Sequence, residues 1–384
     1  MEGNGLMKKF SLKPNIVYEK DSIEYLREIN IKNSLIITDK FMVKSNITKK
    51  VTDILDEEET KYEIFSKVQP NPSSDLVVDG VDIMLKFKPD SIIAIGGGSA
   101  IDAAKGIILF YMNIMNKSSK ENVVKPYFIA IPTTSGTGSE VTSYSVITDN
   151  DTHVKMAFSE DIMLPDLAIV DPDFTNSVPP SVTADTGMDV FTHALEALVS
   201  NQSSDFTDTL ASGVLKIVFS YLLRAYRNGN DTLARQKMHN ASCMAGIAFT
   251  NSALGINHSM GHAFGARFKV SHGRAVAIFL PYVIEYNSFD SICAHKYSDV
   301  AKSIGLPASN IEQGVSSLIE SVKVLNRKLG IPVCIKEMDI GKKEFLDEIE
   351  NMSQTAMEDV CTLGNPRKPK KGDIVAIFKK AYEG

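Results

Sequence analysis

Five short, β-branched runs in the first half of the chain constrain its fold most strongly. Helix-like stretches separate them, for example residues 74–88 and 100–115. Strands that alternate with helices build a parallel sheet that is covered on both faces. We therefore predict an α/β fold with a Rossmann-like parallel sheet. The five runs are SLIITD (34–39), YEIFSKV (62–68), DSIIAIGGGS (90–99), YFIAIPTT (127–134) and LAIVDP (167–172).

The pattern changes after the Pro179-Pro180 pair. Before it, residues 143–149 and 153–158 add a hairpin signal. After it, apolar periodicity predicts an all-α region with almost no strand. Because 384 residues exceed one small core, we expect two domains, α/β over 7–180 and all-α over 181–384. Helices are expected over 183–200, 205–228, 232–249, 259–264 and 274–287, the last of them kinked or shifted by Pro281.

Composition argues against several kinds of partner. The net charge is −6 and is spread along the chain, whereas a nucleic-acid binder needs a basic face. The short basic run at 365–373 is interpreted as a solvated loop before a last helix. No apolar run approaches the roughly 18 residues of a spanning helix, and no signal peptide opens the chain. We therefore expect no membrane partner and a cytoplasmic location. Four scattered cysteines indicate reduced thiols without a cysteine-pair zinc site.

The segment AIGGGSAID (94–102) joins the end of a predicted strand to the start of a helix. Its glycines let backbone N–H groups approach a ligand, and a helix N-terminus favours an anion. The segment can therefore cradle a phosphate. A plain tight turn is the alternative, and the GxGxxG spacing of the common dinucleotide fingerprint is absent.

Two further features lie at predicted strand ends. Asp39 closes the first run, where a carboxylate can accept hydrogen bonds from an adenosine ribose and repel a 2′-phosphate. Capping the next helix is the simpler role for an aspartate there. A second loop, IPTTSGTGSE (131–140), brings Thr133, Thr134 and Thr137 to the end of another strand. Two such loops at the carboxyl ends of parallel strands predict a ligand-binding crevice.

The second half contains an aspartate and a histidine at helical spacing. Asp189 and His193 are four residues apart, so both project from one face of the predicted helix. That pair can hold a divalent metal, but a structural salt bridge would have the same spacing. Glu196 continues the face, and we expect it to orient or pair rather than to ligate.

Three more histidines follow in LGINHSMGHAFGARFKVSHGR. His258 and His262 are again four apart, and His272 comes ten residues later. One carboxylate with two or three imidazoles suits Fe(II) or Zn(II). The HExxH pattern of zinc proteases is absent. Spacing alone favours pairing His258 with His262, and proton transfer or ordinary packing stays open for each histidine.

Together these motifs resemble the iron-containing (group III) alcohol dehydrogenases. The resemblance runs over nearly the whole chain, from FSLKPNIVY to GNPRKP. The most specific motifs of this resemblance are GMDVFTHALEA and NHSMGHAFG followed by SHGRA. Two glycine-containing motifs are more general, GGGSAIDAAK and IPTTSGTGSEVT. Within the family, TGMDVFTHALEALVSNQSSDFTDTLA and KMHNASCMAGIAFTN look most like the propanol dehydrogenases of propanediol-degrading microcompartments.

The resemblance implies a role for each matching residue. The four metal ligands of the family match Asp189, His193, His258 and His272, and a neighbouring non-ligand histidine that is associated with substrate and proton movement matches His262. The pyrophosphate loop matches Gly97, Gly98, Ser99 and Asp102, and the position that favours NAD over NADP matches Asp39. Further cofactor-groove positions match Asn71, Thr133, Thr134, Thr137, Thr142 and Lys155. The family fold has an N-terminal dinucleotide-binding domain and a helical domain, with the metal in the cleft.

The implied activity is NAD-dependent interconversion of a short-chain aldehyde, propionaldehyde or acetaldehyde, and its primary alcohol, and the subfamily implies a 1-propanol dehydrogenase. Fe(II), or alternatively Zn(II), would act as a Lewis acid. The subfamily also implies aldehyde reduction that recycles NADH to NAD, a homodimer, and encapsulation in a bacterial microcompartment with shell or cargo enzymes as partners. One rival is a glycerol dehydrogenase-like or dehydroquinate synthase-like zinc enzyme of the same fold, with three protein ligands. The other is a degenerate homologue without activity, which should have lost ligands or the glycine loop.

Overall fold

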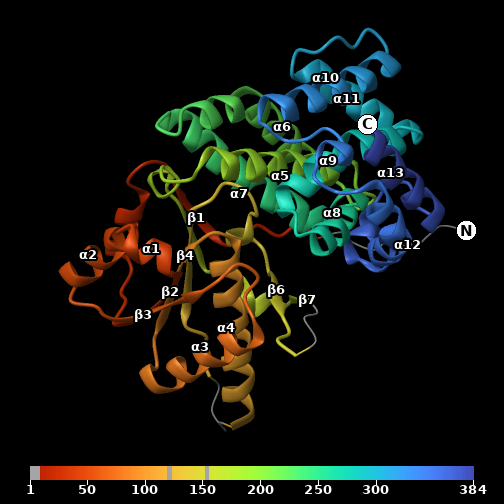
Figure 1. The fold of residues 1–384 in the computed structure, drawn as a ribbon. Helices are drawn as coiled ribbons and strands as arrows, with labels where there is room; N and C mark the ends of the chain where they lie inside the picture. The colour runs from red at the N-terminus through yellow and green to blue at the C-terminus, as the bar shows by residue number, and fades with distance from the viewer. Residues whose placement is uncertain (1–8, 119–122, 152–154) are drawn as a thin grey trace, which may run out of the picture. The chain divides into compact units, whose positions relative to one another are not determined.

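A computed structural model describes residues 9–118, 123–151 and 155–384, and the chain divides into two compact units (Figure 1). The sheet unit comprises Lys13–Thr186 and Arg224–Gly246. The helical unit comprises the described residues 9–12 together with Gly187–Leu223 and Ile247–Gly384. The expected boundary at 180–181 lies just before the change of unit at 186–187. The return of residues 224–246 to the sheet unit was not expected from the sequence.

A six-stranded parallel sheet of order β1-β8-β5-β4-β2-β3 forms the sheet unit. Five of its strands coincide with the five predicted runs. The predicted hairpin is also present as an antiparallel pair, β6 and β7, although its residues 152–154 lie outside the described residues. The strands are β1 (Asn15–Tyr18), β2 (Asn33–Asp39), β3 (Lys61–Val68), β4 (Ser91–Gly96), β5 (Tyr127–Pro132), β6 (Tyr144–Thr148), β7 (Lys155–Ser159) and β8 (Leu167–Val170).

Helices and 3-10 turns connect these strands. They are η1 (Ser22–Glu28), α1 (Lys40–Lys44), α2 (Lys49–Glu57), α3 (Ser74–Phe87), α4 (Gly98–Ser118), η2 (Ser139–Val141), η3 (Asp161–Met163) and η4 (Pro172–Phe174).

Both faces of the sheet are buried. Side chains of a strand alternate between the two faces: Leu35 and Ile37 pack in the core that includes α3 and α4. Ile36 packs in the opposite core, which includes η1 and α2. The central strands β2, β4, β5 and β8 are buried at nearly every position, so they are continuous apolar runs rather than alternating ones. The edge strands β1 and β3 are more exposed.

The rest of the chain is helical, and no strand follows β8 among the described residues. The predicted helices are all present, with α8 longer at both ends than expected and α9 not interrupted by Pro281. These helices and turns are α5 (Pro180–Val199), α6 (Asp205–Arg227), α7 (Thr232–Ser252), α8 (Ile256–Phe268), α9 (His272–Asn287), α10 (Ser291–Ser303), α11 (Ile311–Lys328), η5 (Ile335–Glu337), α12 (Lys342–Glu358), η6 (Val360–Gly364) and α13 (Lys371–Glu383).

No apolar run near the length of a membrane span was expected from the sequence, but among the described helices α6 alone is long and apolar enough to cross a membrane by length and composition. A core helix of a globular unit can have the same length and composition. Val214, Val218 and Leu222 lie on one side of α6 at helical spacing and are fully buried, as a helix that packs on a core requires.

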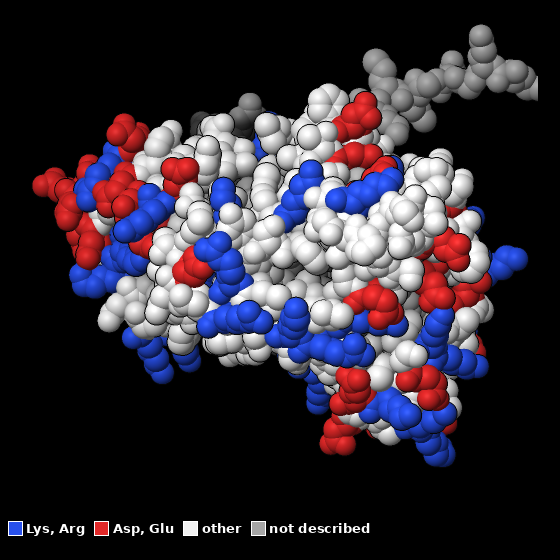
Figure 2. All heavy atoms as spheres, turned by 90° about the horizontal axis from the view of Figure 1, so that it is seen from above, with Lys and Arg blue, Asp and Glu red and all other residues white. Residues whose placement is uncertain are grey.

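On the face drawn in Figure 2, side chains of both charges occur and neither sign covers the face.

The basic segment after η6 is packed more tightly than the predicted solvated loop. The Asn365 side chain is buried, and its Oδ1 accepts a hydrogen bond from the backbone N–H of Ile256 at 3.2 Å. The Arg367 guanidinium donates to the backbone carbonyl of Tyr286 at 3.0 Å and lies over the Tyr286 ring. The segment therefore stabilises the start of α8 through a hydrogen bond, and it also precedes the last helix, as predicted.

Candidate functional site

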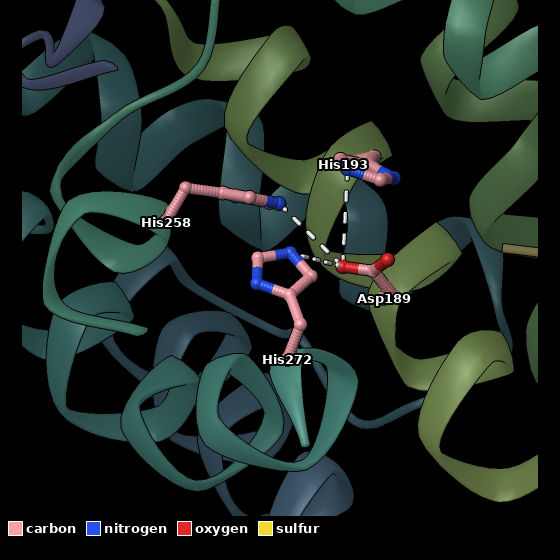
Figure 3. Close-up of side chains that lie close together, drawn as sticks. All are labelled: Asp189, His193, His258 and His272. Carbon is pink, nitrogen blue, oxygen red and sulfur yellow. Dashed lines mark ion pairs between the residues drawn. The ribbon is translucent and has the colours of Figure 1, made fainter. Parts of the chain in front are cut away.

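Three helices of the helical unit bring four possible metal ligands together (Figure 3). Asp189 and His193 project from α5, His258 projects from α8, and His272 is the first residue of α9. The Nε2 atoms of His272, His258 and His193 lie 3.3, 3.5 and 3.8 Å from Oδ1 of Asp189. Bonds of about 2.1 Å to one tetrahedral ion place neighbouring donors about 3.4 Å apart. The observed spacing therefore fits a single metal ion.

Polar atoms at the centre of this cluster fit a cation. Asp189 Oδ1 and His258 Nε2 are buried and make no hydrogen bond to any described residue. Burial without a partner is costly for such atoms, and an ion between the four donors would remove that cost. The His272 side chain is 39% exposed, whereas the other three are at most 6% exposed. The cluster is thus open on one side, as catalytic metal sites are.

A short turn explains how His272 returns to the cluster. Helix α8 ends at Phe268, and Lys269 closes it with a left-handed φ of 56°. Helix α9 then starts at His272 and packs closely on α8 at Gly261. A Cβ at Gly261 would lie only 2.6 Å from the Val276 side chain, so the glycine permits this approach of the two helices.

Glu196 supports His258 from outside the cluster. Its Oε2 contacts Nδ1 of His258, and its Oε1 accepts a hydrogen bond from the backbone N–H of Asn257 at 2.8 Å. A carboxylate partner at Nδ1 leaves Nε2 to face the ligand cluster. This arrangement agrees with the expectation that Glu196 orients or pairs rather than ligates.

Charges around the cluster shift two pKa values in the protein without metal. Burial alone would raise the pKa of Asp189, but the surrounding imidazoles hold it well below its usual range. Burial alone would lower the pKa of His258, but Glu196 and Asp189 raise it to about 10. A metal ion must displace the proton from His258, so metal binding releases protons and weakens as the pH falls.

We expect Glu196→Gln to weaken metal binding by about 10- to 100-fold, the usual effect of losing a carboxylate behind a ligating histidine. Glutamine can still accept from the Asn257 N–H, but it removes the charge that steers His258. Competition with a chromophoric chelator measures the affinity. Glu285→Gln, which breaks an ion pair to Lys380 on the surface, is the matched control. Equal affinity in both variants would contradict the role given to Glu196.

His262 lies beside the cluster and has its own partner. Its ring stacks on that of His272, with centroids 5.1 Å apart. Its Nδ1 lies 2.7 Å from Oδ2 of Asp359. One donor atom each from His262, Asp359 and Cys361 lie within 4.8 Å of one another. No sequence pattern pointed to Asp359, because it is one of 47 acidic residues and lies almost a hundred positions after His262.

The two glycine- and threonine-containing loops of the sheet unit pack against each other. Strands β4 and β5 are neighbours and pair Gly96 with Pro132, so the loops after them start side by side. A Cβ at Gly98 would lie 2.8 Å from the Thr137 side chain, and one at Gly97 would lie 3.2 Å from Thr134 Oγ1. Helix α4 begins at Gly98 and presents its N-terminal N–H groups here. This end of the sheet therefore suits an anion.

Asp39 lies at the same end of the sheet. A Cβ at Gly96 would lie 3.9 Å from the Asp39 carboxylate. Oδ1 of Asp39 also accepts from the backbone N–H groups of Phe41 and Met42, at 2.7 and 3.0 Å. Asp39 therefore caps the next helix and also lies beside the glycine loop. The sheet reverses its connection order between β2 and β4, which is where ligands of doubly wound sheets bind.

Two of the expected cofactor residues, Asp102 and Thr142, make hydrogen bonds that brace the second loop. Oδ1 of Asp102 accepts from the Ser139 hydroxyl at 2.8 Å. The Thr142 hydroxyl accepts from the buried ammonium of Lys105 at 3.0 Å, and Lys105 also donates to the Ser139 carbonyl at 2.7 Å. Burial lowers the pKa of Lys105 to about 8. Sequence reasoning missed Lys105, although it belongs to the GGGSAIDAAK segment.

The other expected cofactor positions vary in their surroundings. Ser99 is partly buried in the first turn of α4, and Thr133 is buried. Asn71 is exposed, with a left-handed φ of 56°, in the turn before α3. Lys155 is the first residue of β7, and its side chain lies outside the described part of the structure.

These features define a protein with a glycine-rich loop at the strand ends of one unit and a cluster of four possible metal ligands, three histidines and one aspartate, on the other. The chain belongs to the iron-containing alcohol dehydrogenase family. Residues 14–172 match the family model for iron-containing alcohol dehydrogenases, and residues 183–382 match the model for the C-terminal part of that family.

Individual relatives and a solved structure agree with this assignment. The NADPH-dependent butanol dehydrogenase of Clostridium saccharobutylicum is 40% identical over 98% of this chain and 99% of its own length. The 1-propanol dehydrogenase PduQ of Citrobacter freundii is 40% identical over 94% and 96%. The aldehyde-alcohol dehydrogenase of Streptococcus pneumoniae is 41% identical over 98% of this chain, which spans only 46% of that longer protein. The alcohol dehydrogenase structure from Oenococcus oeni has a TM-score of 0.91 at 31% identity, with 98% and 100% of the two chains covered.

Proposed function

We propose that this protein is a metal-dependent alcohol dehydrogenase that uses NAD(H) and interconverts propionaldehyde and 1-propanol. The observation that carries the proposal is the convergence of Asp189, His193, His258 and His272 around two buried atoms without hydrogen bonds. The family relation supplies the reaction class. The rival zinc enzymes of the same fold use three protein ligands, whereas this chain offers four donors in one cluster.

When bound, the metal supplies a Lewis acid for a carbonyl oxygen, and NAD(H) supplies or accepts a hydride. The donor set contributes a single negative charge, from Asp189, so the site keeps part of the cation's charge for an electron-rich oxygen. The exposed edge of His272 leaves room for a small substrate. His262, whose side chain is 43% exposed, can exchange a proton between the reacting oxygen and water.

The choice of substrate and cofactor rests on finer arguments. The similarity to 1-propanol dehydrogenase at 40% identity supports a three-carbon aldehyde. The carboxylate of Asp39 beside the glycine loop supports NAD, because it would repel the 2′-phosphate of NADP. The equally similar butanol dehydrogenase that uses NADPH makes a four-carbon aldehyde with NADPH the second candidate.

Anaerobic purification, metal analysis and steady-state kinetics test the proposal. Acetaldehyde, propionaldehyde, butyraldehyde and lactaldehyde are each assayed with NADH and with NADPH. We expect bound iron and the highest kcat/KM with propionaldehyde and NADH. Butyraldehyde with NADPH as the best pair would support the second candidate. No aldehyde-dependent oxidation of either cofactor by metal-loaded protein would refute the dehydrogenase assignment.

Replacing Asp39 tests the cofactor choice. We expect Asp39→Gly to raise the ratio of kcat/KM for NADPH over NADH by about tenfold or more, because about 1.4 kcal/mol of charge repulsion is removed. Glycine costs only a few tenths of a kcal/mol as a helix cap, and Asp39→Asn keeps the cap while it removes the charge. An unchanged ratio in both variants would exclude Asp39 from cofactor selection.

A further inference from the structure

Asp359 lies between the end of α12 and η6, and every side-chain oxygen of this residue has a defined partner. Oδ2 contacts Nδ1 of His262 at 2.7 Å. Oδ1 accepts from the backbone N–H of Cys361 at 2.8 Å and from the Ser259 hydroxyl at 3.3 Å. Ser259 and His262 both belong to α8, so Asp359 connects that helix to η6.

The charge of Asp359 decides how His262 carries its proton. Burial alone would raise the pKa of Asp359, but the hydrogen bond and charge of His262 and the Cys361 N–H lower it to about 2. An ionised carboxylate only accepts hydrogen bonds. The contact at 2.7 Å is therefore a donation from Nδ1 of His262, and in the neutral ring Nε2 carries the lone pair.

The same contact fixes where the ring lies. The His262 ring is parallel to that of His272 within 23° and meets the His258 ring edge-on, with centroids 6.1 Å apart. Two of the four possible metal ligands are thus its neighbours. Because Nδ1 faces Asp359, Nε2 lies on the side of the ring away from that carboxylate, and the His262 side chain is 43% exposed.

We propose that Asp359 is a positioning residue that holds His262 in the Nδ1–H tautomer, so that Nε2 exchanges the reaction's proton. This inference rests on the proposed function. In alcohol oxidation the hydroxyl proton would pass to Nε2 of His262, and bound NAD⁺ would supply the acceptor for the hydride. The imidazolium is stabilised by Asp359 and returns the Nε2 proton to water. Aldehyde reduction runs the same transfers in reverse. The arrangement resembles other histidines oriented by a buried carboxylate.

Histidine NMR tests the tautomer without relying on turnover. Protein labelled with ¹⁵N-histidine is observed metal-free and zinc-loaded, and the His262 signals are assigned with His262→Ala. We expect Nδ1–H for His262 in the unaltered protein and a mixture of tautomers in Asp359→Ala. Glu358→Gln, which removes the neighbouring exposed carboxylate, should leave the signals unchanged. An Nε2–H tautomer in the unaltered protein would overturn the proposal.

A double-mutant cycle on the holoenzyme tests the consequence for the reaction. We expect Asp359→Ala to lower kcat for propionaldehyde by about 10- to 100-fold with little change in KM or metal content, and Asp359→Asn, which keeps an acceptor oxygen, to lose less. In the His262→Ala background, Asp359→Ala should cost less than about twofold. A loss as large in that background as in the unaltered protein would mean a purely structural role and refute the proposal.

The two tests separate the inference from the function on which it rests. Absence of turnover with every aldehyde in the unaltered protein would refute the proposed function, while the NMR result still decides whether Asp359 sets the tautomer. An altered tautomer in Asp359→Ala with unchanged kcat would overturn the positioning role even in an active dehydrogenase.

Discussion

Asp189→Asn is expected to abolish both metal binding and turnover. Asp189 supplies the only negative charge in the ligand cluster, and its Oδ1 lies within 3.8 Å of all three imidazole Nε2 atoms. Without it, a divalent cation must be held by neutral donors alone. Loss of a Lewis acid worth about 4 kcal/mol in the transition state corresponds to a fall in kcat of about 10³-fold or more. Metal analysis of anaerobically purified protein and kinetics with propionaldehyde and NADH measure both effects.

The control for this variant is Asp205→Asn, which removes an exposed aspartate from the first turn of α6. It should retain metal and activity. His272→Ala, which removes the most exposed ligand, should resemble Asp189→Asn. Turnover at the level of the unaltered protein in Asp189→Asn after treatment with a chelator would show that the cluster is not the catalytic metal site.

Short β-branched runs predicted most of the sheet because its central strands are buried on both faces. The run from Leu35 to Ile37 is fully buried, and such a strand needs apolar residues at every position. Strand β1 has only partly buried or exposed side chains and therefore produced no comparable run. The return of residues 224–246 to the sheet unit had no signal either, because contact between distant segments leaves no local pattern when it is made by helices of ordinary composition.

The candidate site was predictable only in part. Helical spacing predicted that Asp189 and His193 lie on one face of a helix. The same spacing argument also favoured a pair formed by His258 and His262. The family resemblance chose His272 instead, and the folded chain places His272 in the cluster and His262 on Asp359. The turn between α8 and α9, which starts at Lys269, brings His272 to the cluster. Residue spacing in the sequence does not reveal the geometry of this turn. The homodimer and the microcompartment location stay predictions.

Gly364→Ala is expected to destabilise the helical unit strongly. Gly364 ends η6, and a Cβ there would lie 2.1 Å from the backbone oxygen of Leu254 and 3.0 Å from the Ala253 Cβ. A backbone oxygen cannot rotate away as a long side chain can, so η6 must move relative to the start of α8. Its own carbonyl, which accepts from the Asn201 N–H at 3.0 Å, would move with it. Overpacking of this kind costs about 3 kcal/mol.

Gly213→Ala provides a comparison with the opposite sign. Gly213 lies within α6, and apart from the adjacent residues and the nearby backbone of α6 itself, no atom of the described residues lies within 4 Å of the position of its Cβ. Alanine there should stabilise the protein by about 0.5–1 kcal/mol, because glycine loses more backbone entropy in a helix. Thermal midpoints of the metal-free proteins at one scan rate measure both variants. A lower midpoint is expected for Gly364→Ala and a higher one for Gly213→Ala. Equal thermal midpoints for the two variants would mean that η6 can shift without a loss of stability. Asp359, which precedes η6, would then be less rigidly placed than its hydrogen bonds indicate.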